Sequence, residues 1–270
     1  MSGRFLSWLP PVVVLAVAAP AAGWAQAFDH SLYDGLLQAH VREGLVDYDA
    51  FARAPEFEAY LRSLAAFDPG SLPREEQLAF WINAYNAYTI KLIIKHGERV
   101  SIRNINKSVG FIKGNGPWRE KLAAIGGAVY TLDFIEQQII RPTFREPRIH
   151  FALVCAAMGC PPLRSEAFTG ARLDEQLDDQ ARAFLLHSPA KNRVDTATGT
   201  VFVSPIFKFR DYEQDFGGSK AAVARFIARY YPEGPAKALL ERGAWTRWEY
   251  TAYDWTLNSQ EHAGRAAPAR

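Results

Sequence analysis

One long helical segment is apolar on most of its sides, and this feature constrains the fold more than any other. It reads SLPREEQLAFWINAYNAYTIKLIIKHG, from Ser71 to Gly97. Pro73 and the acids after it suit a helix start, and Lys95 with His96 suits a helix end. The segment therefore predicts a helix that other elements cover on most sides. Its apolar positions are Leu78, Ile82, Tyr85, Thr89 and Leu92, with Trp81, Tyr88 and Ile93 beside them.

Two asparagines, Asn83 and Asn86, lie three residues apart inside this apolar surround. A buried amide is costly unless it is hydrogen-bonded, so we expect both side chains to bridge to the backbone or to polar groups of neighbouring elements. Two amides that fix the helix to a loop are the favoured interpretation. The alternative is that they belong to a catalytic site.

The first 27 residues differ in kind from the rest of the chain. MSGRFLSWLPPVVVLAVAAPAAGWAQA has Arg4 near its start, an apolar run from Val12 to Ala19 and small residues at its end. This order is typical of a secretory signal peptide, and the apolar run is shorter than the roughly 20 residues of a spanning helix. We expect cleavage before Phe28 and a periplasmic or secreted protein, without a membrane span after cleavage.

The composition indicates an ordinary globular protein without a strong charge preference. Lys and Arg number 31 against 29 Asp and Glu, a net charge of +2, which gives no general attraction to nucleic acid. There is no GxSxG, Walker or HExxH motif and no GxGxxG after a strand, so no cofactor is expected.

The remaining patterns predict a single α+β domain. It would span residues 28–258, with a helix-rich N-terminal part followed by a mostly antiparallel sheet with packed helices, and a flexible tail over 259–270. Residues 101–118 are typical of a long loop. Helices are expected over 29–44, in a further stretch that ends at about Phe67, from Asp133 to about Ile140, over 173–187 and over 221–231. Hairpins are expected around Gly126-Gly127 and Thr198-Gly199, and strands over 148–154 and 247–258.

Both cysteines lie in the segment HFALVCAAMGCPPLR. On a regular strand His150 and Cys155 would point to opposite faces about 16 Å apart, which makes His40, on a buried helix stripe, the leading base for a Cys155 nucleophile. Gly159 allows the chain to turn and export favours oxidation, so we expect a disulfide between Cys155 and Cys160. Without a second cysteine pair or a histidine pair, no metal site is predicted.

Several motifs in order resemble the domain of unknown function 547 family, over about His40 to Asn258. They are LAFWINAYNAYTIKL, RIHFALVCAAMGCPPL, LDEQLDDQARAFL, SPIFKFRDYEQDF and YDWTLN. The resemblance implies no agreed activity. The positions that it marks are Trp81, Asn83, Asn86, His150, Cys155, Pro161, Asp215, Asp254 and Asn258.

A binding or accessory module is the favoured function. It would take an unidentified small molecule, peptide or periplasmic protein through the loop 101–118 and exposed aromatics such as Trp118, with the cysteines as a structural bridge. A disulfide-exchange protein is less well supported because the CxxC spacing is absent.

The alternative is a cysteine-dependent hydrolase or acyl-transferase of papain-like or transglutaminase-like layout. It requires a free thiolate and a histidine within hydrogen-bond reach. The nucleophile would be Cys155 and the base His40 or His150, with Asn83, Asn86 or Asp254 to orient the imidazole or donate to an oxyanion.

Overall fold

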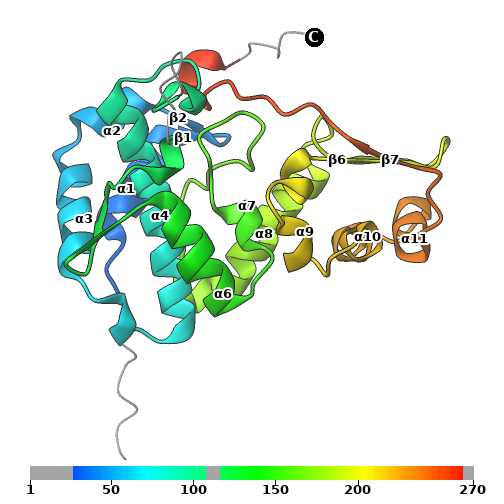
Figure 1. Ribbon diagram of the computed structural model, residues 1–270, viewed down its shortest axis with the longest axis horizontal. Helices are drawn as coiled ribbons and strands as arrows, with labels where there is room; N and C mark the ends of the chain where they lie inside the picture. The colour runs from blue at the N-terminus through cyan, green and yellow to red at the C-terminus, as the bar shows by residue number, and fades with distance from the viewer. Residues whose placement is uncertain (1–26, 108–115, 264–270) are drawn as a thin grey trace, which may run out of the picture.

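The computed structural model describes residues 27–107 and 116–263, and these form an α+β arrangement dominated by helices (Figure 1). The predicted signal peptide up to Gln26, the centre of the predicted loop (108–115) and the end of the predicted tail (264–270) lie outside the described residues. The helices are α1 Ser31–His40, α2 Tyr48–Arg53, α3 Pro55–Ala66, α4 Arg74–His96, α5 Leu132–Phe134, α6 Arg141–Phe144, α7 Ile149–Ala152, α8 Leu173–Leu186, α9 Tyr212–Asp215, α10 Lys220–Ala228 and α11 Pro235–Arg242.

The expected central helix is α4. Its side chains from Leu78 to Ile90 are all buried, and Gly97 ends it in the left-handed conformation at φ 57°. Helix α2 and the π-helical turn Ile135–Ile140 pack against it. The prediction of a helix covered on most sides is confirmed.

The strands form small sheets at the margins of the described helices. The hairpin β3–β4 turns at Gly126 and Gly127, both at positive φ as a two-residue turn of this hand requires. Strand β6 pairs antiparallel with β5 and parallel with β7, so the described pairings are mostly antiparallel, as predicted. The strands are β1 Val41–Arg42, β2 Leu45–Val46, β3 Ala123–Ile125, β4 Ala128–Tyr130, β5 Arg193–Asp195, β6 Thr200–Val203 and β7 Arg247–Tyr250.

The buried apolar side chains of the described residues form two clusters that meet along α8. Leu173 and Leu177, near the start of α8, belong to the cluster built around α1 to α4, whereas Phe184 and Leu185 belong to the cluster of β6, α9 and α10. In Figure 1, α8 accordingly lies between the N-terminal helices and the group formed by α9, α10 and α11. The seam between the two clusters is where the candidate site lies.

The expected strand at 148–154 is wrong. Residues Ile149–Ala152 form the single helical turn α7, with the Leu153 N–H donating to the Ile149 carbonyl at 2.9 Å, and only the residues after it are extended. A short apolar run does not distinguish a strand from a buried helical turn. The side-chain alternation that was expected to separate His150 from Cys155 therefore does not apply.

Two predicted boundaries also need correction. The helix expected from Asp133 begins at Leu132, because the Thr131 hydroxyl caps it by accepting from the Phe134 N–H at 3.0 Å. At the other end of the chain, Ser259 and His262 are buried and the short 3-10 helix Gln260–His262 packs against the domain. The predicted tail boundary at Ser259 is therefore too early.

Candidate functional site

A cavity of about 250 Å³ opens at the seam between the two apolar clusters. Leu153 comes from the first cluster and Ile206 from the second, and aromatic rings cover much of the remaining wall. The site thus combines residues that are far apart in the sequence. Its lining side chains are Tyr85, Trp118, Glu136, His150, Leu153, Cys155, Cys160, Pro161, Ile206, Phe209, Arg210, Tyr212, Tyr253 and Trp255.

A disulfide between Cys155 and Cys160 forms one part of the cavity wall, which confirms the expected pairing. Cys160 is 2% exposed, whereas Cys155 is half-buried. The backbone N–H of Cys155 donates to the Cys160 sulfur at 3.1 Å. The Tyr253 hydroxyl lies 3.0 Å from the Cys155 sulfur and 3.1 Å from the Cys160 sulfur.

Asn86 holds the chain just before the disulfide. Its amide donates to the Ala152 carbonyl at 2.9 Å and its carbonyl oxygen accepts from the Val154 N–H at 2.9 Å. Asn83, one turn earlier on α4, makes the same pair of bonds to the backbone of Phe168, at 2.8 and 2.9 Å. The expected bridging of both amides to backbone is confirmed, and both fix the helix to irregular segments.

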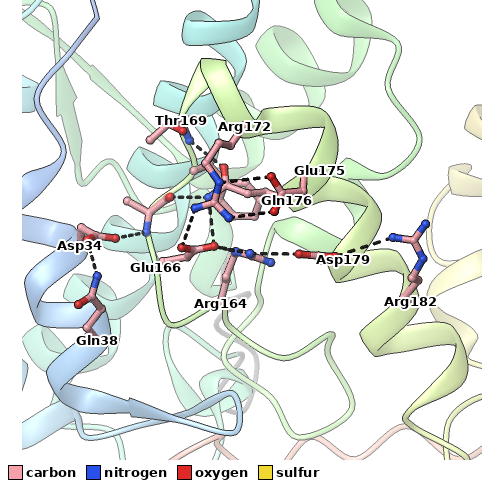
Figure 2. A network of polar contacts seen from close by, with 12 residues as sticks. Asp34, Gln38, Arg164, Glu166, Thr169, Arg172, Glu175, Gln176, Asp179 and Arg182 are labelled. Atoms are coloured by element: carbon pink, nitrogen blue, oxygen red, sulfur yellow. Dashed lines mark hydrogen bonds and ion pairs between the residues drawn. The ribbon is translucent and has the colours of Figure 1, made fainter.

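Helix α8 supplies a second pair of amides to the same irregular stretch. Gln180 donates to the carbonyls of Phe151 and Pro162, and Gln176 exchanges hydrogen bonds with Ala167 and Thr169. Figure 2 shows Gln176 at the centre of a wider set of ion pairs along this face of α8. These pairs join Arg164, Glu166, Arg172, Glu175, Asp179 and Arg182.

The disulfide loop is also paired with the C-terminal segment. Met158 and Gly159 donate their backbone N–H groups to the carbonyls of Thr256 and Asp254, both at 2.8 Å. This pairing carries Tyr253 across the disulfide. The Tyr253 ring is held there against the rings of Phe209 and Trp255, at centroid distances of 5.0 and 4.5 Å, and these two rings also contact each other.

The cavity lining also contains a buried carboxyl group, that of Glu136. It accepts from the Tyr85 hydroxyl at 3.4 Å and from the Tyr212 hydroxyl through a short hydrogen bond. Burial, and then the neighbouring Glu136 charge, raise the pKa of both tyrosines, so their hydroxyls remain protonated donors. Each Glu136 oxygen keeps a lone pair that a ligand can use.

His150 is oriented by an acid on α9. Its Nε2 lies 2.7 Å from Asp215 Oδ2, and its ring stacks on that of Tyr212 at 4.1 Å. Arg141 donates to both oxygens of Asp215, at 2.6 and 3.1 Å. Although burial opposes the charge on Asp215, hydrogen bonds from His150 and Arg141 lower its pKa to about 2.

This lowered pKa predicts an acid-sensitive contribution to stability. Because the folded pKa lies below the ordinary value near 3.8, Asp215 stabilises the fold above about pH 4, and this contribution is lost as the pH falls towards 2. Allowing for partial exposure, Asp215→Asn should lower the free energy of unfolding by about 1–2 kcal/mol at pH 7 and by little at pH 2. Urea denaturation measures the difference, and Asp211→Asn, a change at the exposed partner of Arg141, is the control. An equal loss at both pH values would contradict the assignment.

The structure brings some of the candidate residues together and separates others. His150 and both cysteines line the cavity, although no described hydrogen bond joins His150 to Cys155. His40 lies at the end of α1, with its ring against Phe51. The Asp254 carboxyl accepts from the Thr256 N–H. The residue that orients the His150 imidazole is Asp215, not Asp254, which was considered for this role. Trp118 lines the cavity, with its ring against Trp255.

The residue patterns of the sequence did not point to four residues that shape this site: Tyr85, Glu136, Tyr212 and Tyr253. Tyr85 lies one residue before Asn86 and was assigned to the apolar stripe, and Asp215 was marked by the family resemblance alone. No spacing signal connects Glu136 to a tyrosine 76 residues later.

The described residues contain no group of three His, Cys, Asp or Glu side chains placed to hold a metal ion. None of the described helices combines the length and apolar character that crossing a bilayer requires.

Residues 69–185 match the model of the family described as "Protein of unknown function, DUF547". The matched region runs from the turn before α4 to the end of α8 and includes Glu136, His150 and both cysteines, but not Tyr212, Asp215 or Tyr253. The expected resemblance is confirmed for this region. Searches of curated proteins and of solved structures gave no match.

Proposed function

We propose that this chain, which carries a DUF547 region, is an exported binding or accessory module whose ligand enters the cavity beside the Cys155–Cys160 disulfide. One observation supports this most strongly: a cavity formed by both apolar clusters combines aromatic walls with a few convergent polar groups. Apolar pockets with a small number of placed polar groups are the usual form of a ligand site.

The size and lining of the cavity indicate the kind of ligand. About 250 Å³ is below the range of roughly 300–1,000 Å³ for whole drug-sized ligands, so the cavity suits a small molecule or one side chain of a peptide. Leu153, Ile206 and Phe209 would contact an apolar body. Glu136 and His150 would then bind a hydrogen-bond donor on that body.

Export is supported by two features of the chain. The first 27 residues have the order of a secretory signal peptide, and a disulfide persists in the oxidising compartments to which such a peptide directs a protein. The disulfide would hold the wall of the cavity in one shape, which favours binding by reducing the ordering that a ligand has to impose.

A cavity-filling variant tests the proposed binding. Dipeptides with one leucine or phenylalanine side chain should raise the melting temperature of the oxidised wild-type protein by about 5–10 °C at about 100 times their Kd. Ile206→Trp should weaken this binding at least about tenfold, because the larger ring occupies the cavity. Val129→Trp, at an exposed position on β4, is the matched control. Unchanged binding by Ile206→Trp would place the ligand elsewhere.

A cysteine-dependent hydrolase or acyl-transferase is the second candidate function, and one observation favours it. Cys155 and His150 line the same cavity, and Asp215 orients the His150 ring, so reduction of the disulfide would give a thiol in the same cavity as an oriented imidazole. This function requires two free thiols in the protein as exported, one of them reacting quickly at neutral pH. A thiol titration with and without reductant distinguishes it from the binding module.

A further inference from the structure

The two sulfurs of the disulfide are in different environments. Both cysteines border the cavity, but Cys155 is half-buried, whereas Cys160 is 2% exposed. The backbone N–H of Cys155 donates to the Cys160 sulfur alone. A hydrogen-bond donor directed at a sulfur stabilises the thiolate that forms there when the S–S bond opens.

Two further polar groups lie beside the disulfide and the Cys160 backbone. The Tyr253 hydroxyl lies 3.0 Å from the Cys155 sulfur and 3.1 Å from the Cys160 sulfur, and burial raises the pKa of Tyr253, so the hydroxyl remains a donor to a thiolate that forms at Cys160. The Lys191 ammonium donates to the carbonyl of Cys160 at 2.6 Å. Burial lowers the pKa of Lys191 to about 8, against the effect of Asp254, so most of its charge is kept at pH 7.

We infer that the ligands of the cavity include small or peptide thiols with an apolar body, and that such a thiol exchanges with the disulfide by attack on Cys155. The inference rests on the proposed function, since it names a ligand class for the same cavity. The apolar wall beside Cys155 binds the body of the thiol, and Cys160 is the leaving sulfur.

The exchange needs no oxidant or reductant other than the disulfide and the thiol ligands. The thiolate sulfur of the ligand forms a bond to the Cys155 sulfur, the S–S bond breaks, and its electron pair remains on Cys160 as a thiolate. This thiolate accepts from the Cys155 N–H and the Tyr253 hydroxyl. Attack by a second thiolate on the ligand sulfur of the mixed disulfide yields the ligand disulfide and the dithiol protein, and the reverse reactions restore the oxidised protein.

The position of the first adduct tests the inference. Oxidised full-length protein is treated with benzyl mercaptan at pH 7, quenched with acid at successive times, alkylated and mapped by tandem mass spectrometry. We expect the benzyl adduct on Cys155 and the alkyl group on Cys160, with a preference of at least about ten to one. Adducts on Cys160, an equal distribution, or no adduct would overturn the inference.

The Tyr253 hydroxyl provides a second readout that differential exposure alone would not change. Tyr253→Phe should slow disulfide opening about tenfold or more, since a hydrogen bond to a charged group contributes about 1.5–3 kcal/mol. Tyr231→Phe, at a tyrosine three residues after the end of α10 whose hydroxyl makes no described hydrogen bond, is the control, and circular dichroism verifies that both variants are folded. Equal opening rates for Tyr253→Phe and wild type would remove the assigned role of this hydroxyl and overturn the inference.

A thioether ligand distinguishes a failure of the thiol exchange from a failure of the proposed binding function. Benzyl methyl sulfide has the same apolar body but no thiol, so a rise in melting temperature reports binding in the cavity without exchange. If the sulfide binds and benzyl mercaptan forms no adduct, the exchange fails and the binding module stands. If the sulfide and the dipeptides both fail to bind, the proposed function fails, and the thiol-ligand inference that rests on it fails too.

Discussion

Asn86→Ala is expected to lower the free energy of unfolding by about 2–5 kcal/mol. The substitution removes the side-chain amide and leaves the Ala152 carbonyl and the Val154 N–H without their hydrogen-bond partner in a buried region. An unsatisfied buried donor or acceptor costs about 1–3 kcal/mol each, and the truncation adds a small cavity beside α4. This is a large share of the 5–15 kcal/mol that holds a typical domain together.

Urea denaturation of the oxidised protein measures this loss, and two further variants isolate its cause. Asn104→Ala removes an exposed amide and should change the stability by less than about 0.5 kcal/mol. Asn86→Asp keeps the acceptor for Val154, but an ionised carboxylate would face the Ala152 oxygen. Its destabilisation should therefore be smallest below about pH 4, where a protonated carboxyl can donate, and should grow above it. A pH-independent loss in Asn86→Asp would argue against the paired hydrogen bonds as the cause.

The position of Asn86 also connects the fold to the site. The stretch from Phe151 to Thr169 contains little regular structure, so its backbone groups need partners from elsewhere. Amide side chains on α4 and α8 supply several of these partners. One of them, that of Asn86, accepts from the Val154 N–H directly before Cys155. A rigid helix therefore positions a disulfide that lies in a loop.

The predictions from sequence that succeeded concern local signals. The bounds of α4 follow from its acids at one end and Gly97 at the other, and the hairpin β3–β4 follows from Gly126-Gly127, because only a positive φ closes such a turn. The bridging of Asn83 and Asn86 follows from the cost of a buried amide. Each of these arguments needs only the neighbouring residues.

The parts that could not be predicted depend on which distant segments meet. The turn α7 and a strand have the same apolar pattern, and the end of α7 is held by a pair of hydrogen bonds from Asn86, 66 and 68 residues away. In the same way, Asp215 rather than Asp254 reaches His150, because the segment of α9 packs against the side chains of α7. No spacing along the chain reveals this contact. The cavity itself exists only where the two apolar clusters meet.

Gly159 shows how closely the C-terminal segment approaches the disulfide loop. A Cβ atom at this position would lie 2.9 Å from the Asp254 nitrogen, 3.0 Å from its oxygen and 3.0 Å from the Tyr253 ring. Two of these neighbours are backbone atoms of Asp254, and its oxygen accepts from the Gly159 N–H, so they cannot move away without breaking the Gly159–Asp254 hydrogen bond. The segment that places Tyr253 on the sulfurs thus requires a glycine here.

Gly159→Ala is accordingly expected to lower the free energy of unfolding by about 1–3 kcal/mol, the usual cost of an overpacked site. Thermal and urea denaturation of the oxidised protein measure the change. Gly35→Ala on α1 is the same chemical change at a position where a Cβ meets nothing within 4 Å. Because alanine loses less conformational freedom than glycine in a helix, this control should raise the stability by about 0.5–1 kcal/mol. The two substitutions should therefore have opposite signs, and a Gly159→Ala protein as stable as wild type would show that the C-terminal segment does not pack on the disulfide loop as described.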